Sequence, residues 1–308
     1  MEESGIQFRS NGKLMLSGEY LVLHGALSLA VPTILGQSLL VREADSADTL
    51  TWKTKVVSKP WMECEIDPDK WQFIHANEPN RARNLVLVLK AASEIREDTS
   101  WLKGKEVISE IEFNIEWGLG SSSSLISNIA WWADVDPFHL SAMVSGGSGY
   151  DIACARSDQP LIYRTGDAEP RYTTVDFMPP FHEQVAFVYL GKKQDSASSV
   201  RNYLNKALVL EKDISNISAI TEKLCRCEQL FEFEHLMREH EGVLSHILGL
   251  PPVKQGLFKD YHGDVKSLGA WGGDFVMITM HQEWSRVKTY FSAKGMETII
   301  PYDKMVKA

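Results

Sequence analysis

A glycine-serine turn is the segment of this sequence best suited to chemistry. It reads Trp117-Gly118-Leu119-Gly120-Ser121-Ser122-Ser123-Ser124. Glycine lets a backbone approach a ligand closely, and the first N–H groups of a helix, aided by the helix dipole, favour an anion such as phosphate. Serine hydroxyls add hydrogen bonds or a magnesium ligand. The turn indicates a phosphate site, and the alternative is a plain connection between two elements.

Three further segments carry groups that could react or bind. Residues 11–20 set Lys13 at the edge of an apolar strand, and residues 145–153 place the single acid Asp151 among small residues. Residues 269–274 form a second glycine turn before an apolar run. A carboxylate within hydrogen-bond reach of a hydroxyl can act as its general base, and a neighbouring lysine keeps that carboxylate ionised. The ordinary alternatives are a solvated lysine at a strand end and an aspartate that serves a turn or caps a helix.

Strand and helix patterns flank these segments. Residues 111–117 alternate at the two-residue period of a half-buried strand, and residues 125–134 can form a helix, which predicts a strand, a turn and a serine-rich helix start. Together with the full extent of this strand, 107–117, the expected strands cover residues 14–23, 38–43, 161–164, 185–190, 275–280 and 297–301. The other expected helices cover residues 84–95, 200–211, 217–230, 234–248 and 284–293. This order is α+β rather than the strict alternation of a doubly wound sheet.

In this order, the segments resemble the three motifs of the GHMP kinase family, which includes galactokinase and homoserine, mevalonate and phosphomevalonate kinases. The first motif, P-G-K followed by G-E-H/Y, matches Gly12-Lys13 and Gly18-Glu19-Tyr20, with Asn11 in place of proline. The core of the second, P-x-G-x-G-L-G-S-S-A, is intact at residues 118–122. The third, G-A-G-G-G-D, matches residues 269–274.

The sequence departs from these motifs at several positions. Asn114, Glu116 and Ser123 replace the proline, a glycine and the alanine of the second motif, and Trp271 fills a glycine position of the third, where it would crowd a backbone meant to lie near substrate or phosphate. Mevalonate kinases carry a magnesium-binding glutamate that falls here at Leu140. Phosphomevalonate kinases also lack it and tend to have a histidine nearby, as at His139. The resemblance is therefore closest to the mevalonate/phosphomevalonate kinase branch.

The resemblance implies a two-domain α+β fold. Residues 1–180 would form an ATP-binding half like ribosomal S5 domain 2, and residues 181–308 a ferredoxin-like half, with the site in the cleft. Pro179-Pro180 marks the expected boundary.

The resemblance also implies an ATP-dependent kinase that transfers the γ-phosphoryl group to a hydroxyl or phosphate of a mevalonate-type acid. Asp151 would be the catalytic base and Lys13 its catalytic neighbour, with ATP and Mg²⁺ as cofactors. The residues assigned to ATP are Gly118, Leu119, Gly120, Ser121, Ser122 and Ser123, and Ser122 is also the metal ligand. The residues assigned to substrate are Glu19, Tyr20, His24, Lys192, Lys193, Ser196, Gly269, Ala270 and Gly272.

The lysine pair lies in a segment that resembles the basic turn by which mevalonate-type kinases contact substrate. Lys192 and Lys193 would meet a carboxylate or phosphate as point charges. The alternative is an ordinary helix start, with a serine at 196, 198 or 199 as the N-cap of a helix from about residue 200. Two rivals to the whole assignment are a kinase-like protein that binds nucleotide or metabolite without turnover, and a GHMP kinase for homoserine or a sugar.

Composition agrees with a small-molecule enzyme. The 308 residues are 44% hydrophobic and carry a net charge of -9, which argues against a nucleic-acid partner. No long apolar run or signal peptide appears, so we expect a cytoplasmic protein without membrane contact, as a monomer or homodimer. Cys225 and Cys227, with histidines nearby, match no zinc signature. No G-x-x-x-x-G-K-S/T is present, so a P-loop NTPase is not expected.

Overall fold

The computed structural model describes residues 5–166, 169–194, 196–206 and 208–308, without the side chains of Ser196, Ala197 and Lys206. These residues form two compact units, each discontinuous in the sequence. The first unit comprises Met1–Gly12, Leu35–Ile115 and Leu119–Arg156, and the second comprises Lys13–Ile34, Glu116–Gly118 and Ser157–Ala308. Two long strands, β1 (Ile6–Ser17) and β2 (Ser28–Glu43), contribute residues to both. The domain boundary expected between residues 180 and 181 stays a prediction.

The first unit is built on a sheet with the strand order β5-β4-β3-β6-β2. Neighbouring strands are antiparallel except for the parallel pair β3 and β6. Leu50, Trp52 and Thr54 are buried while the residues between them are partly exposed, which is the two-residue period of a sheet with one covered face. The strands besides β2 are β3 (Leu50–Val56), β4 (Lys59–Asp67), β5 (Gln72–Ala76) and β6 (Lys105–Ile111).

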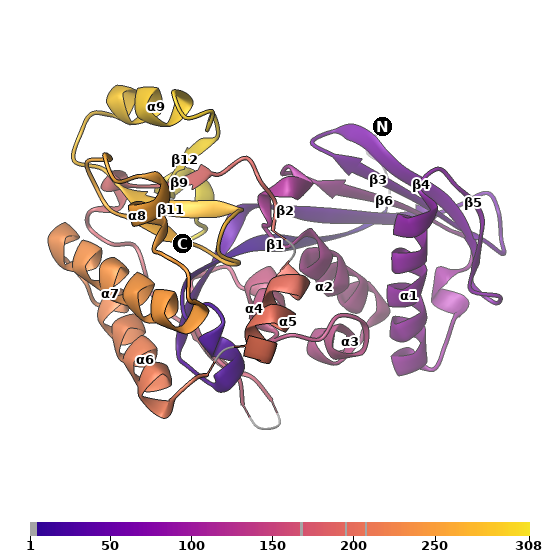
Figure 1. Cartoon of the computed structure of the whole chain (residues 1–308). Helices are drawn as coiled ribbons and strands as arrows, with labels where there is room; N and C mark the ends of the chain where they lie inside the picture. The colour runs from indigo at the N-terminus through magenta and orange to yellow at the C-terminus, as the bar shows by residue number, and fades with distance from the viewer. Residues whose placement is uncertain (1–4, 167–168, 195, 207) are drawn as a thin grey trace. The chain divides into compact units, whose positions relative to one another are not determined.

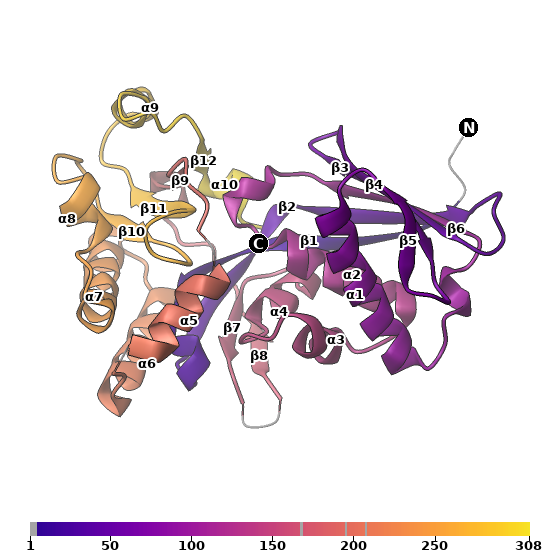
Figure 2. The same ribbon diagram turned by 45° about the vertical axis from the view of Figure 1, so that its right-hand side comes forward.

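Helices cover one face of this sheet, as Figures 1 and 2 show. Their apolar sides complete a core in which Trp52, Leu89 and Ile129 are fully buried. Burial of one such side chain contributes about 1.5–3 kcal/mol, so this core fixes the helices on the sheet. The helices are α1 (Pro79–Arg96), α2 (Ser121–Ala133), α3 (Pro137–Val144) and α4 (Tyr150–Arg156), with the short 3₁₀ turn Ser100–Leu102.

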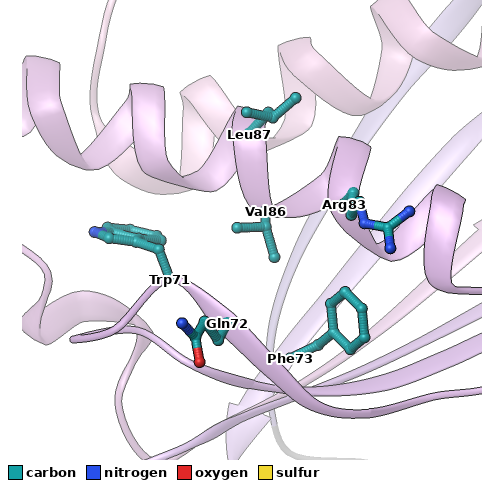
Figure 3. Close-up of a pocket in the computed structure, with 6 residues that line it drawn as sticks. All are labelled: Trp71, Gln72, Phe73, Arg83, Val86 and Leu87. Carbon is teal, nitrogen blue, oxygen red and sulfur yellow. The ribbon is translucent and has the colours of Figure 1, made fainter.

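A cavity of about 510 Å³ opens between β5 and α1 (Figure 3). Trp71 and Phe73 face Val86 across it, and the guanidinium of Arg83 lies at one end. Gln72 and Leu87 complete the lining. Trp71 has a φ of 56°, a left-handed backbone that is uncommon for a bulky residue. None of the residues that the sequence assigns to catalysis or binding lines this cavity.

The second unit holds an antiparallel sheet with the strand order β10-β11-β9-β12. Every residue of the central strand β11 is buried, because side chains on both of its faces are covered. In the same unit the start of β2 pairs with β7, and β7 pairs with β8. The strands are β7 (Leu161–Arg164), β8 (Arg171–Thr174), β9 (Val185–Tyr189), β10 (Val265–Ser267), β11 (Phe275–Thr279) and β12 (Ile299–Pro301).

Helices α6 and α7 lie side by side in this unit (Figure 1). The helices are α5 (Ser196–Lys206), α6 (Glu211–Cys225), α7 (Leu230–Leu248), α8 (Val253–Leu257), α9 (Trp284–Ser292) and α10 (Tyr302–Met305). Short 3₁₀ turns cover Leu21–His24, Ile115–Trp117 and His182–Gln184.

The expected elements are largely present, with three informative errors. The strand expected over residues 107–117 ends at Ile111, and Phe113 is buried to 1% exposure without belonging to a strand. The strand expected over residues 14–23 ends at Ser17, because Gly18 and Tyr20 take φ values of 99° and 62° that turn the chain. The helix expected from residue 200 begins four residues earlier, so positions 198 and 199 lie inside α5 and do not cap it.

Candidate active site

The glycine-serine turn forms the start of α2. Gly120 takes a left-handed φ of 85°, and its carbonyl accepts the N–H of Ser124 at 3.0 Å as the first helical hydrogen bond. The first N–H groups of a 13-residue helix have no partner within the helix, and the dipole makes this end positive. Ser122 is exposed, whereas Ser124 is buried and donates to Gln37 Oε1 at 2.8 Å. The turn thus offers a fixed backbone and one exposed serine, Ser122, which agrees with the phosphate hypothesis.

Asp151 lies beside this helix start, within the same unit. The hydroxyl of Ser123 donates a hydrogen bond to Asp151 Oδ2, and the Ile152 N–H donates to Asp151 Oδ1 at 3.1 Å. Asp151 lies in the first turn of α4, close to the turn or helix-cap position that the sequence offered as the ordinary alternative. Ser123, in the alanine position of the motif, therefore fixes the carboxylate that we expect to act on the substrate. Sequence reasoning assigned Ser123 to ATP and did not find this pair.

We expect Ser123→Ala, which restores the motif residue, to lower kcat about fivefold with little change in the KM for ATP. The loss corresponds to about 1 kcal/mol for one hydrogen bond that orients the carboxylate. Steady-state kinetics of the purified variant measure it, with Ser127→Ala, one turn further along α2, as a matched control. A rise in the KM for ATP at unchanged kcat would return Ser123 to a nucleotide-binding role.

In the second unit, the basic turn and the second glycine turn are joined through their backbones. The Asp274 N–H donates to the carbonyl of Lys192 at 2.8 Å, and the Leu190 N–H donates to the carbonyl of Asp274 at 2.9 Å. A Cβ at Gly273 would lie 2.5 Å from the Lys192 carbonyl oxygen, so only glycine fits there. The structure therefore brings together two segments that were assigned separately to substrate.

Tyr20 connects the first motif with the second glycine turn. Its hydroxyl accepts the backbone N–H of Trp271 at 3.2 Å, and its ring lies 5.0 Å from the ring of Tyr203, which also contacts His24. Burial raises the pKa of Tyr20. Trp271 itself is only 8% exposed, so protein atoms cover most of its surface.

The carboxylate of Glu19 is buried in an ion pair with Lys266. The two side chains are 1% and 0% exposed, and the Glu19 pKa is well below its usual range: burial opposes the charge, but Lys266 and His240 outweigh it. His240 Nε2 accepts the Gly18 N–H at 3.0 Å and lies 3.1 Å from Glu19 Oε2. Burial and the charge of Lys266 lower the His240 pKa, while Glu19 opposes that shift. These contacts hold the Gly18-Glu19 bend onto α7 and β10.

A second acid lies near this pair. Glu241 accepts the N–H groups of Ser267 at 3.0 Å and Val253 at 3.2 Å. Burial raises the Glu241 pKa to about 7, although Lys266 and the two N–H groups partly oppose the rise.

We expect Glu241 to make the free energy of unfolding fall as pH rises. A carboxyl whose pKa is higher in the folded than in the unfolded state holds its proton more tightly when folded, so stability declines between about pH 4.5 and pH 7 and is flat above. Urea unfolding at several pH values measures the decline, and Glu241→Gln should remove it. An unchanged slope in Glu241→Gln would assign the decline to another group.

The two residues expected to act directly in catalysis belong to different units, Asp151 to the first and Lys13 to the second. Leu140 is fully buried. Over the described ranges, no three His, Cys, Asp or Glu side chains gather as a metal site, and the α6 end at Cys225 is no exception. The side chain of Ser196 lies outside the described part of the chain. The assignments of individual residues to ATP, magnesium and substrate stay predictions.

Comparison with known proteins gives a fold and no sequence relative. No family model and no curated protein matches the sequence. The Methanococcus jannaschii mevalonate kinase aligns over 97% of this chain and 98% of its own, with a TM-score of 0.72 at 15% identity. The chain has the GHMP kinase fold. This confirms the fold predicted from the three motifs.

Other solved structures with the GHMP kinase fold differ in their ligands. A Streptococcus pneumoniae phosphomevalonate kinase, in complex with phosphomevalonate and AMPPNP, has a TM-score of 0.70 at 15% identity over 96% of this chain and 99% of its own. A Lactococcus lactis galactokinase complexed with galactose has a TM-score of 0.66 at 12% identity, over 99% of this chain and 96% of its own.

Among the helices in the described part of this chain, none combines the length and the apolar character that a membrane span requires.

Proposed function

We propose that this protein transfers the γ-phosphoryl group of ATP to a hydroxyl or phosphate of a mevalonate-type acid. The observation that carries the proposal is the carboxylate of Asp151, held by Ser123 at the N-terminal turn of α2. A helix start favours phosphate, and a carboxylate next to it can receive the proton of an attacking hydroxyl. Phosphoryl transfer needs little else than this alignment and nearby positive charge.

The first turn of α2 would hold the phosphates of ATP through its backbone N–H groups, with Gly120 keeping the approach open. The exposed Ser122 could ligate Mg²⁺ at this turn. Leu140 is buried and offers no carboxylate, so the protein would supply few ligands to the ion. Magnesium commonly keeps several waters and binds to substrate phosphates, so one hydroxyl suffices as protein ligand. When bound, the ion would neutralise charge on the phosphates.

Asp151 would orient the substrate hydroxyl and accept its proton as the new O–P bond forms and the bond from the γ-phosphorus to the ADP oxygen breaks. Both carboxylate oxygens are already engaged, by Ser123 and by the Ile152 N–H, so the group is pre-oriented. We assign to Lys13 the offset of negative charge that develops on the transferred group.

The basic turn supports an acid as substrate. Lys193 Nζ lies 3.8 Å from Glu116 Oε1, and the charge of Lys193 lowers the pKa of Asp274 against the effect of burial. The backbone carbonyl of Lys192 accepts the Asp274 N–H. Lysine ammonium groups bind carboxylate and phosphate as point charges, while a sugar site needs several hydrogen-bonding groups.

We expect Lys193→Ala to raise the KM for the acidic substrate about tenfold, with little change in kcat or in the KM for ATP. A lost charge-assisted contact costs about 1.5–3 kcal/mol, and a contact made equally in ground and transition states appears in KM alone. Lys192→Ala is the matched control. An equal effect of both variants would assign the role to the charge of the turn as a whole.

The decisive experiment is a phosphorylation screen with ATP and Mg²⁺ against mevalonate, phosphomevalonate, homoserine and sugars. Turnover of mevalonate or phosphomevalonate supports the proposal, and turnover of galactose or homoserine alone would overturn the substrate assignment. The rival is a non-catalytic protein that binds nucleotide or metabolite. It is favoured by the missing carboxylate at Leu140 and by Trp271, and nucleotide binding without any turnover would select it.

A further inference from the structure

Asp274 adopts a backbone conformation that its residue type disfavours. Its φ is 53°, in the left-handed region, and the side chain is only 8% exposed. A non-glycine residue in this region persists where its surroundings hold it in place, and such strain is concentrated at functional sites. Glycine would adopt this backbone without strain, so the contacts of the carboxylate must account for an aspartate at this position.

The carboxylate and backbone of Asp274 fix the basic turn. Oδ1 accepts the Gln194 N–H at 3.1 Å, and the backbone of Asp274 is bonded to Lys192 and Leu190. Three hydrogen bonds from one residue therefore set the path of residues 190–194.

The same carboxylate packs directly against Gly118, the first glycine of the glycine-serine turn. A Cβ at Gly118 would lie 2.7 Å from Asp274 Cγ and Oδ2 and 2.9 Å from Oδ1, closer than real Cβ contacts come. Gly118 also has a φ of 67°. Glycine is required at 118 both by its backbone and by the carboxylate beneath it.

Charges of both signs act on the carboxylate of Asp274. Burial raises its pKa, and the charges of Lys13 and Lys193 oppose that rise, while Glu116 adds to it. A nearby carboxylate lowers the mutual repulsion of two ammonium groups.

We propose that Asp274 is a positioning residue that holds the basic turn, residues 190–194, and the Gly118 end of the glycine-serine turn in one arrangement. The inference rests on the proposed kinase function for its catalytic consequence, but its structural part is independent of activity. Asp274 touches no reacting atom in this scheme. Its carboxylate and backbone keep the two turns in the places where phosphate and acid substrate would meet them.

The structural part is tested by hydrogen exchange and by a double-mutant cycle. Asp274→Ala should speed exchange of the Gln194 amide about tenfold, whereas Asp264→Ala, an equally buried aspartate of the same unit, should leave that amide unchanged. Gly118→Ala should lower the melting temperature by about 3–6 °C in the wild type and clearly less in the Asp274→Ala background, because the clash is gone. Equal shifts in both backgrounds, or an unchanged Gln194 amide, would overturn the proposal.

The catalytic part is tested by Asp274→Asn, which keeps the shape and the acceptor Oδ1 but removes the charge. We expect kcat to fall at least about tenfold while the KM for ATP stays level or drops, since the lysines lose a competing anion. Wild-type kcat in Asp274→Asn would overturn the charge role. If no substrate is turned over at all, the exchange and melting results still decide whether Asp274 positions these segments, so the two failures are distinguishable.

Discussion

Lys266→Met is expected to lower the free energy of unfolding by about 3–5 kcal/mol, the largest stability loss we expect from one side chain. The substitution leaves the carboxylate of Glu19, 1% exposed, without its positive partner, and a buried charge without compensation costs about this much. Chemical denaturation at pH 7 measures the loss.

Two further measurements identify its cause. The double variant Lys266→Met/Glu19→Gln should recover most of the stability, because no unpaired charge remains. In Lys266→Met alone, the deficit should shrink as pH falls from 7 to 4, because the buried, unpaired Glu19 then takes up a proton in the folded variant. In the folded wild type, Lys266 holds the Glu19 pKa well below this range. A deficit that is the same at pH 4 and pH 7 would show that lost packing, and not the lost charge, accounts for it.

Asp151→Asn is expected to reduce turnover by at least about a hundredfold while nucleotide still binds. Asparagine preserves the side-chain shape and can accept a hydrogen bond from Ser123, but it cannot take the proton of the substrate hydroxyl. Single-turnover kinetics and calorimetric titration with an ATP analogue measure the two quantities.

Asp134→Asn is the matched control for this change. Asp134 ends α2 with a φ of 56°, which asparagine also tolerates, and it is exposed. We expect its activity to stay near that of the wild type. Activity of Asp151→Asn within a few-fold of wild type would remove Asp151 from the chemistry.

Local sequence patterns predicted which helices and strands carry the motifs, but they predicted the ends of these elements less well. The serine-rich start of α2 was expected from the helix rules and begins at Ser121. The alternation in residues 111–117 wrongly predicted a strand, because β6 ends at Ile111 and Phe113 is buried from an irregular segment. Periodic burial reports which side chains face the core, and an irregular backbone can satisfy the same period.

The motif residues were found from sequence, but their partners were not. Lys266 and Glu19 are 247 positions apart, and nothing near Lys266 marks it as buried. Asp274 was noticed only as the last letter of a motif, since its left-handed backbone and its contact with Gly118 depend on the folded chain. Ser123 was assigned by its place in the turn, and only the structure shows that its hydroxyl points to Asp151. Long-range pairs of this kind follow from topology, which the local patterns of a single sequence do not reveal.

The sharing of β1 and β2 between the two units has a consequence for biosynthesis. The chain passes from one unit to the other five times, and Ser17 finds its partner Thr221 only 204 residues later. At about 5–20 residues per second, a ribosome needs roughly 10–40 s to deliver that partner. During this interval the second-unit ends of β1 and β2, with Leu16 and Leu29 destined for burial, are exposed on the nascent chain. A newly made molecule is therefore most in need of chaperone protection before α6 emerges, and slower translation of residues 157–221 should lower the yield of soluble protein.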